Sequence, residues 1–450
     1  MRKILPQNLI FLAENAPFPL YVVGGTVRDH LAGLIQKTKD LDICSPMTPE
    51  IFANFATEHG FFVKSVFKNT GTVKLQDEDG TDYEYSCFRS DKYIRGTHVP
   101  VEIYFTDKIE LDARRRDFTA NAVYYDIKAD KFLDPLNGIS AIQEKRFTTV
   151  APAKKVFGED GLRLMRLARQ AATLGFVPDE DCLIGATENA SLIDDISPER
   201  IFTELTAILH ADEKYGNVDG PYQGLRLLEK TGVLARILPE LALGKNMAQR
   251  ADFHKYDVLE HSLRAVKYAP SNIRLAALLH DVGKPTCTIH DGNSYNHPIM
   301  GEQLARNILI RLKAPKKTIE TVCALVRWHM YDMDCKTSES KLRRFFVEHY
   351  FILEDLLCLK QADFSACMDD MREAPTCARW RKLLAQMQAE HTPFTLKDLA
   401  VNGMDLRNLG IQPARISTLL QKLLLHTANA PQDNQKDRLL TLAISFNNGI

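Results

Sequence analysis

Short runs of apolar, β-branched and aromatic residues recur through the first third of the chain, and such runs predict β-strands. Successive side chains of a strand point to opposite faces, so residues two apart share a face. The predicted strands cover residues 20–23, 40–43, 61–63, 72–75, 83–88, 101–105 and 122–125. We therefore expect a sheet-containing domain in this part of the sequence.

The hydrophobic pattern becomes helical after the turn sequence Asp-Pro-Leu-Asn-Gly at residues 134–138 and stays helical to the end. Ser197 followed by Pro198 is typical of a helix start, with the serine as N-cap. A chain of 450 residues exceeds what one hydrophobic core usually organises, so several modules are expected. The predicted fold class is α+β, with a mixed α/β head followed by a long helical body.

Composition and charge narrow the possible functions. The chain is 45% hydrophobic and 26% charged, which is ordinary for a globular protein. It has no apolar run long enough to span a bilayer and no secretory pattern, so we expect a cytoplasmic protein without a membrane partner. The 57 Lys and Arg balance the 58 Asp and Glu, so any nucleic acid has to be bound by local patches. Nine cysteines without CxxC spacing argue against a zinc ribbon or a disulfide framework. Nothing in the sequence defines an oligomeric state.

Two carboxylates follow a glycine pair near the start of the sequence. Asp40 and Asp42 share a face of one predicted strand, and Gly24 and Gly25 form a turn whose backbone can approach phosphate. Mg²⁺ prefers oxygen ligands and keeps substrate phosphates as partners, so the pair suits two-metal phosphoryl chemistry. Arg28 could then bind a triphosphate. Two solvated acids after an ordinary turn are the alternative.

Two nearby groups extend this candidate site. Asp82 and Glu84 alternate along a strand face, and Glu84 is our candidate for a third catalytic carboxylate. Arg116, Asp117 and Asn121 lie in one basic segment, where a guanidinium group could bind phosphate and an amide could hold a ribose or an Asp side chain. For the first group the alternative is an ordinary surface strand, and for the second it is a charged loop.

Asp160, Arg163, Arg166 and Arg169 recur every three residues and would form one ridge on a helix. A carboxylate accepts from an exocyclic amine while a guanidinium group donates to ring acceptors, and this combination fits cytosine and adenine. Uracil and guanine offer the reverse pattern. A solvated ridge of salt bridges is the alternative interpretation.

Imidazoles and carboxylates form a second candidate site farther along the chain. The series consists of His261, His280, Asp281, His297, His329 and Asp363. Single histidines are mostly structural, but the adjacent His280-Asp281 pair within this series predicts a metal site. Such nitrogen and oxygen ligands suit Mn, Fe, Co, Ni or Zn rather than Mg.

Five ordered motifs resemble those of bacterial-type (class II) tRNA nucleotidyltransferases, the CCA-adding enzymes. They lie at residues 24–29 (GGTVRD), 40–42 (DLD), 115–122 (RRDFTANA), 134–138 (DPLNG) and 159–163 (EDGLR), and the resemblance extends over residues 1–245. It implies a polymerase-β-like nucleotidyltransferase head followed by an all-helical neck, body and tail. It also implies addition of C, C and A to the 3′ end of tRNA from CTP and ATP.

The resemblance implies a role for each matching residue. Asp40 and Asp42 match the Mg²⁺ ligands, and Asp160 and Arg163 match the amino-acid template that selects the base. The other matching nucleotide contacts are Gly25, Arg28, Arg116, Arg166 and Arg169. Ala120 departs from the pattern, because the family more often has Ile or Val there.

The histidine series resembles the HD phosphohydrolase domain that some bacterial tRNA nucleotidyltransferases carry. This implies metal-assisted hydrolysis of a phosphomonoester or a 2′,3′-cyclic phosphate. The implied domains are the nucleotidyltransferase head (1–140), the helical neck with base recognition (141–245), the HD domain (246–365) and a helical tRNA-binding tail (366–450).

Two alternatives stay open at this point. Within the transferase class, a poly(A) polymerase or a CC-only or A-only enzyme would share the head motifs. From another class, the chain could be an HD phosphohydrolase whose head only binds RNA. The intact Asp40, Asp42, Arg116 and Asp160 argue against a non-catalytic head.

Overall fold

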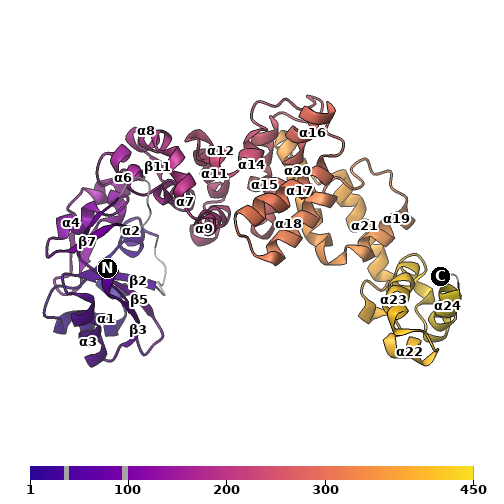
Figure 1. The fold of residues 1–450 in the computed structure, drawn as a ribbon, viewed down its shortest axis with the longest axis horizontal. Helices are drawn as coiled ribbons and strands as arrows, with labels where there is room; N and C mark the ends of the chain where they lie inside the picture. Colours follow the sequence, from indigo (N-terminus) through magenta and orange to yellow (C-terminus); the bar gives the residue numbers. More distant parts are fainter. Residues whose placement is uncertain (35–39, 94–99, 449–450) are drawn as a thin grey trace. The chain divides into compact units, whose positions relative to one another are not determined.

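The computed structural model describes residues 1–34, 40–93 and 100–448, and of Asp40 it describes the backbone alone. The chain forms two compact units, Met1–Pro239 and Glu240–Ile450. Strands occur in the first unit, and helices make up the second (Figure 1). The predicted α+β class is confirmed.

A seven-stranded mixed sheet with the order β3-β4-β5-β2-β1-β8-β9 organises the first part of unit 1. Neighbouring strands are antiparallel except for β2 and β5, which run parallel and pair Asp42 with Glu84. The strands are β1 Tyr21–Val23, β2 Asp40–Ser45, β3 Phe62–Phe67, β4 Thr72–Gln76, β5 Asp82–Cys87, β8 Tyr124–Asp126 and β9 Lys131–Leu133. Six of the seven predicted strands therefore lie in this sheet.

One face of the sheet is apolar because alternate residues of its strands point the same way. In β5, Tyr83 and Tyr85 are buried, whereas Glu84 between them is exposed. Tyr85 stacks on Phe52 of α3 (Pro49–Glu58) with ring centroids 3.6 Å apart. This packing fixes β5 and leaves the opposite face, with its carboxylates, free of the core.

The structure departs from the prediction in three places, the first of which is β9 (Lys131–Leu133), an unpredicted edge strand of the main sheet. The strand predicted at 101–105 forms β7 (Glu102–Phe105), which pairs with β6 (Arg89–Lys92) in a separate two-stranded sheet. In the segment predicted to be helical, β10 (Arg146–Phe147) and β11 (Val177–Pro178) form a short parallel pair. Such short pairings join segments distant in sequence, and local periodicity carries little information about them.

Helices surround the sheet and continue to the end of unit 1. Ser197 occupies the N-cap position of α9, as predicted, although its side chain makes no capping hydrogen bond. The helices are α1 Gln7–Asn15, α2 Gly25–Leu31, α4 Ile109–Arg114, α5 Gly138–Gln143, α6 Ala153–Glu159, α7 Leu162–Leu174, α8 Glu180–Glu188, α9 Pro198–Leu209, α10 Asp212–Tyr215, α11 Gly220–Lys230 and α12 Val233–Ile237, with α13 Pro239–Ala242 at the boundary.

Unit 2 is helical over its described residues. Its helices α14, α15, α18 and α20 pack against one another around buried leucines, valines and alanines. The helices are α14 Val258–Tyr268, α15 Arg274–Leu279, α16 Gly283–Asp291, α17 His297–Arg311, α18 Lys316–Trp328, α19 Glu339–Glu348, α20 Leu353–Met368, α21 Pro375–Ala389, α22 Gly403–Asn408, α23 Pro413–Thr427 and α24 Lys436–Asn448.

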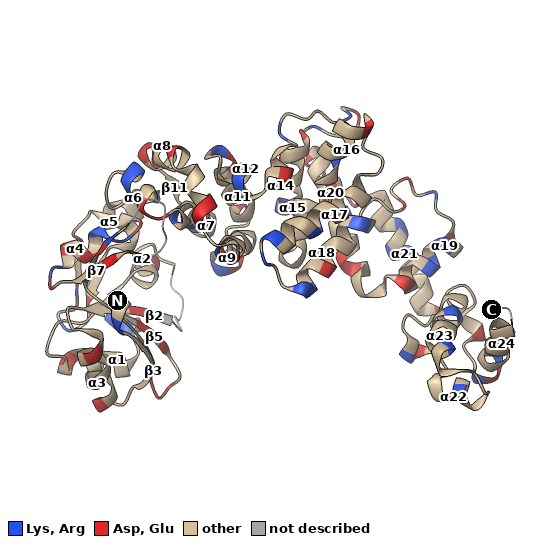
Figure 2. Cartoon of the chain, in the orientation of Figure 1, with Lys and Arg blue, Asp and Glu red and all other residues tan. Residues whose placement is uncertain are grey.

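Basic and acidic residues are interspersed along the helices of both units (Figure 2). This agrees with the nearly balanced charge of the sequence. Of the helices in the described ranges, none combines the length and the apolar character that crossing a membrane requires.

Candidate functional site

A cavity of about 690 Å³ lies in unit 1, between the sheet and the helices that follow it. Its described lining contains seven basic residues and three aspartates, so it favours an anionic ligand. The charged residues are Arg28, Arg115, Arg116, Arg163, Arg166, Arg169, Lys214, Asp42, Asp117 and Asp160, and Gly24, Gly25 and Asn121 also line it. Almost all sequence-predicted residues of the first site thus surround one space.

Asp42 and the glycine turn lie together in the lining of this cavity. Asp42 is exposed on β2, between the buried Leu41 and Ile43. Gly24 has a φ of +77°, and a Cβ built on it would lie 3.1 Å from Oδ2 of Asp42. A larger residue at position 24 would therefore be strained and would crowd the carboxylate. The side chain of Asp40 lies outside the described residues, although its backbone pairs with Asp82 in β5.

Glu84 lies beside Asp42 in the parallel register of β2 and β5, on the same face of the sheet. Its Oε2 is 3.7 Å from Nζ of Lys74. Glu84 is not among the residues that line the cavity. Its role as a third catalytic carboxylate stays a prediction.

Asp117 connects the sheet region to α7. Its Oδ2 accepts from Nε and Nη2 of Arg166, at 2.9 and 2.7 Å, and its Oδ1 accepts from Asn121 at 2.8 Å. Burial raises the pKa of Asp117, but Arg166 and Asn121 outweigh burial, and the pKa lies below its usual range. Arg28 donates from Nη1 to Asn121 and to Gln170, at 2.8 and 2.9 Å. Asp117 and Asn121 therefore hold the cavity arginines in position.

Asp112 is fully buried and accepts hydrogen bonds from both arginines of the Arg-Arg-Asp segment (residues 115–117). Its Oδ1 accepts from Arg115 at 2.7 Å, and its Oδ2 accepts from Arg116 at 3.0 Å and from the Tyr124 hydroxyl at 2.7 Å. Burial raises the pKa of Asp112, but the two arginines outweigh burial and lower that pKa to about 2. The two guanidinium groups are thereby fixed at the cavity wall.

We expect Asp112→Asn to destabilise this region by about 2–4 kcal/mol at neutral pH, because it leaves two buried guanidinium groups without a charge partner. The folded-state pKa of about 2 lies below the ordinary value of 3.8. The contribution of Asp112 is therefore present above pH 3.8 and is lost as the pH falls toward 2. Hydrogen exchange of residues 109–126 at neutral and acid pH measures this difference.

The exposed Asp107→Asn is the matched control for this measurement. Equal protection of residues 109–126 in both variants at neutral pH would contradict a stabilising role for Asp112.

Asp160 and Arg163 also line the cavity. The predicted continuous helical ridge was wrong for Asp160, which is extended and precedes α7, because its Oδ1 accepts from the Leu162 N–H at 2.9 Å. Arg163 is on α7 and donates to the carbonyl oxygens of Val156 and Arg115, at 2.9 and 2.8 Å. These bonds fix the guanidinium beside Asp160 with both side chains lining the same space.

Arg166 and Arg169 continue the basic row on α7, as predicted. Nε of Arg169 lies 2.7 Å from the Glu204 carboxylate of α9, and burial lowers the pKa of Arg169. Both guanidinium groups line the cavity.

In unit 2, six side chains of the predicted histidine series converge, and we call them the HD cluster. They fall into two groups of three whose ligand atoms lie within 4.8 Å of one another. The groups are His261, His280 and Asp363, and Asp281, His297 and His329. All six are at most 6% exposed. Three of them lie in α14, α17 and α20, and the other three directly follow α15 and α18. This is why they are spread over about a hundred residues of the sequence.

The HD cluster has the electrostatics of a cation site. Nε2 of His297 lies 3.2 Å from Nε2 of His329, and Oδ1 of Asp281 lies 3.2 Å from the former. Burial lowers the pKa of His329 to about 4, and its Nδ1 donates to the Val326 carbonyl at 2.7 Å. Its Nε2 therefore presents an electron pair to the cluster. Oδ1 of Asp281 accepts no hydrogen bond from the described residues. A divalent ion would satisfy these facing acceptors.

Asp281 and Asp363 also stabilise positive charge in this cluster. Nε2 of His261 is 3.0 Å from Asp363, and Nζ of Lys284 is 2.6 Å from Asp281. Burial opposes a charge on His280, but Asp281 and Asp363 outweigh burial and raise the pKa of His280 to about 10. A metal ion binding here would displace that proton.

Sequence reasoning missed several supporting residues. Asp112 is three and four residues before Arg115 and Arg116, and Gln170 is four residues after Arg166, so helical spacing was the available signal. Lys284 follows His280-Asp281 closely in sequence. Each of them positions a predicted site residue.

Comparisons with known proteins agree with this geometry. Residues 20–148 match the family described as "Poly A polymerase head domain", and residues 175–243 match "Probable RNA and SrmB- binding site of polymerase A". Residues 254–359 match "HD domain". The matches thus cover the sheet region, helices α8 to α12 and the HD cluster up to His329, and residues 149–174 with α6 and α7 lie between the first two matches.

Two relatives and one solved structure resemble most of the chain. The A-adding tRNA nucleotidyltransferase of Deinococcus radiodurans is 30% identical over 372 residues, which cover 78% of this chain and 77% of that protein. The CC-adding tRNA nucleotidyltransferase of Thermus thermophilus is 32% identical over 421 residues, covering 88% and 87%. The fold resembles that of the Bacillus stearothermophilus CCA-adding enzyme crystallised with CTP, with a TM-score of 0.67, 23% identity and 98% of each chain covered. The chain therefore belongs to the family of tRNA nucleotidyltransferases.

Proposed function

We propose that this protein adds C, C and A to the 3′ end of tRNA, using CTP and ATP as substrates and no nucleic-acid template. One observation carries the proposal: a single cavity is lined by Asp42 and a glycine turn, by Asp160 with Arg163, and by a row of further arginines. A nucleoside triphosphate needs both kinds of group, cations and a metal-binding carboxylate for its phosphates and a hydrogen-bonding pair for its base. Relatives named CCA-adding enzymes support the same activity.

In this proposal, Asp40 and Asp42 hold Mg²⁺, which would activate the tRNA 3′-hydroxyl and neutralise the departing pyrophosphate. Gly24 lets the backbone come close to the metal-bound phosphates. Arg28 and Arg116 bind the triphosphate, and Arg166 and Arg169 extend that binding along α7. Glu84 is proposed as a further acidic residue of the catalytic group.

Asp160 and Arg163 are proposed to read the base. A carboxylate oxygen of Asp160 would accept from the exocyclic amine of cytosine or adenine, and Arg163 would donate to a ring nitrogen. Both bases satisfy this pair, so it excludes uracil and guanine but does not choose between CTP and ATP.

The proposed domain division is the head at 1–140, the base-recognising neck at 141–245, the HD domain at 246–365 and a tRNA-binding tail at 366–450. Lys and Arg along the tail helices would contact tRNA phosphates. We expect the enzyme to work in the cytoplasm, on tRNA.

Three tRNA substrates test the proposed activity: one lacking CCA, one ending in C and one ending in CC. With CTP and ATP together, the purified protein should extend all three to the same CCA end. Extension that stops after CC, or only of the CC-ended substrate, would show a CC-only or A-only enzyme. Long adenosine tails would show a poly(A) polymerase.

We expect Asp160→Ala to reduce the preference for CTP over UTP by about 10- to 100-fold, because the lost pairing is worth roughly 1–3 kcal/mol. Competition between labelled CTP and UTP for one tRNA measures the preference as a ratio, which is insensitive to a partial loss of folded enzyme. The exposed Asp195→Ala of the same unit is the control. An unchanged ratio in Asp160→Ala would remove Asp160 from base selection.

We further propose that the HD cluster binds a transition metal ion, Mn, Fe, Co, Ni or Zn, and hydrolyses a phosphomonoester or a 2′,3′-cyclic phosphate. Oδ1 of Asp281, which accepts no hydrogen bond from the described residues, and the facing histidine nitrogens support this second activity. When bound, the ion would supply a nucleophilic hydroxide.

A further inference from the structure

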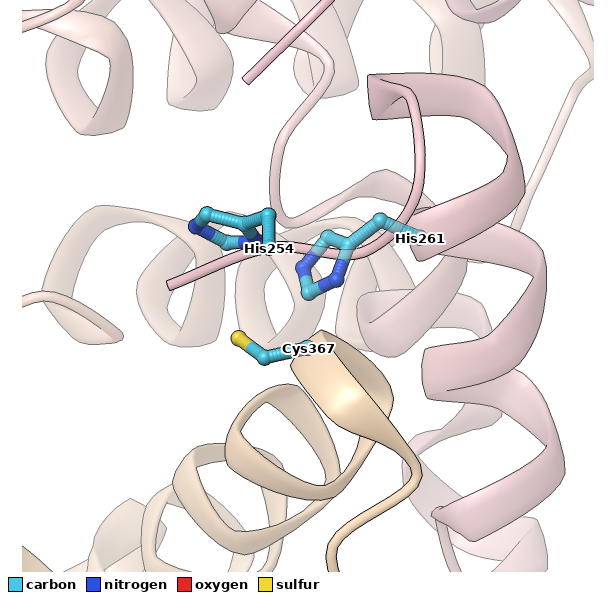
Figure 3. A group of neighbouring side chains, drawn as sticks. All are labelled: His254, His261 and Cys367. Carbon is cyan, nitrogen blue, oxygen red and sulfur yellow. The ribbon is translucent and has the colours of Figure 1, made fainter. Parts of the chain in front are cut away.

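A third group of ligand atoms lies beside the HD cluster and includes a sulfur. The side chains of His254, His261 and Cys367 point toward one another, and one ligand atom of each lies within 4.8 Å of the others (Figure 3). His254 precedes α14, His261 is on α14 and Cys367 is near the end of α20. Among the described residues, no other group of this kind contains a cysteine.

Two nitrogens of this group are buried without a hydrogen-bond partner among the described residues, namely Nδ1 of His254 and Nδ1 of His261. His261 is completely buried, and its Nε2 is already within 3.5 Å of His280, Asp281 and Asp363. Buried imidazole nitrogens normally have a hydrogen-bond partner, so two nitrogens that lack one among the described residues need an explanation. A bound cation is one explanation, and the thiol of Cys367 nearby also favours a cation.

Hydrogen bonds within the protein already hold His254 and Cys367 close together without a metal ion. The Lys255 N–H donates to the Cys367 carbonyl at 2.9 Å. Asp369, two residues after Cys367, accepts from Nη1 of Arg264 and from the hydroxyl of Tyr268, each at 2.6 Å. His254 and Cys367 are therefore already adjacent, and an ion would not have to assemble the site. Both are partly exposed, which gives an ion a path from solvent.

We propose that His254, His261 and Cys367 form a second metal site for zinc or another thiolate-binding divalent ion, sharing His261 with the HD cluster. The HD cluster offers only nitrogen and oxygen ligands, whereas this site adds a thiolate, so the two differ in ligand softness. Mn²⁺ is expected at the HD cluster alone. Zn²⁺, Cd²⁺ and Co²⁺ are expected to bind through Cys367 as well, and the thiol proton leaves to solvent as the metal–sulfur bond forms. When both sites are occupied, His261 bridges them as an imidazolate, and its ring N–H proton also leaves to solvent.

Sharing His261 couples the two sites. An ion bound to Cys367 changes the donor strength and position of a residue that also serves the HD cluster, so occupancy of one site alters affinity at the other. The site would make the HD cluster sensitive to thiolate-binding metals in particular. The inference rests on the geometry of the three residues and does not require nucleotidyl transfer or phosphohydrolase activity.

Cobalt binding to the full-length protein tests the proposal. Co²⁺ coordinated by a thiolate has a ligand-to-metal charge-transfer absorption in the near ultraviolet, which nitrogen and oxygen ligands do not produce. Wild-type protein should show this band. Cys367→Ser should lose it, and His254→Ala should weaken Cd²⁺ binding at this site by at least about 10-fold, the lower end of what losing even an outer-shell partner costs.

Cys358→Ser is the matched control, since Cys358 lies on the same helix and belongs to no ligand group of the described residues. It should keep the band, and His280→Ala, which removes a residue of the HD cluster and none of the three proposed ligands, should keep it too. Absence of the band in wild type, or its persistence in Cys367→Ser, would overturn the proposal.

X-ray absorption of the zinc-loaded wild type gives a reading that does not depend on any variant. One sulfur at about 2.3 Å from zinc is the expected result. A coordination shell of nitrogen and oxygen alone would equally exclude the site.

Discussion

Replacing Asp42 with asparagine is expected to reduce CMP and AMP incorporation into tRNA by at least about 10³-fold, because a metal ligand stabilises transition-state charge by several kcal/mol. The substitution keeps the shape of the side chain and removes its charge. Asp42 is exposed, so the fold should not suffer. Single-turnover incorporation from labelled CTP measures the chemical step, and tRNA binding, measured separately, should be close to wild type.

The control for this experiment is Asp79→Asn, an exposed aspartate in the turn between β4 and β5. Near-normal incorporation by Asp42→Asn would remove the metal role from this carboxylate. It would also favour the alternative in which the first unit only binds RNA and the HD cluster is the sole active site.

Replacing Asp281 with asparagine is expected to lower the transition-metal affinity of the HD cluster by at least about 100-fold, since even outer-shell substitutions cost 10- to 100-fold. The Asp281 carboxylate lies within 3.6 Å of all four histidines, so it touches both groups of three. Metal content after dialysis is the direct measurement. Hydrolysis of p-nitrophenyl phosphate and of 2′,3′-cyclic AMP should fall in parallel.

Asp334→Asn, at an exposed position of unit 2, is the corresponding control. CCA addition by Asp281→Asn should be unchanged, because the lining of the N-terminal cavity comes from unit 1. Full retention of bound metal by Asp281→Asn would show that this carboxylate is not a ligand.

The sequence predicted the parts of the fold that depend on local pattern. Strand alternation located β2 and β5 and placed Asp42 and Glu84 on one face, because side-chain direction follows residue parity. The sequence could not place β7, since whether a strand joins the main sheet depends on contacts distant along the chain. The three-residue spacing predicts a helical Asp160, but its carboxylate accepts from the Leu162 N–H two residues on, and the chain is extended there between α6 and α7.

The candidate site divides in the same way. Charged residues such as Arg116 and Arg163 were visible because their types and motifs are distinctive. Asp112, which accepts from Arg116, and Gln170, which accepts from Arg28, look ordinary in sequence, and only the fold shows that they bond to cavity arginines. The sequence pattern does not predict that His254 and Cys367 are close, because a loop and a helix end more than a hundred residues apart bring them together.

The hydrogen bonds around Asp117 also limit how the first unit can move. Gln170 on α7 accepts from Arg28 and Asn121, and Arg166 on the same helix is paired with Asp117, so α7 is locked to the sheet region by buried polar bonds. A hinge between them would have to break several of these hydrogen bonds at once. We therefore expect a change of nucleotide preference during successive additions to arise within the cavity or from the growing tRNA end, with the helix and the sheet keeping their relative positions.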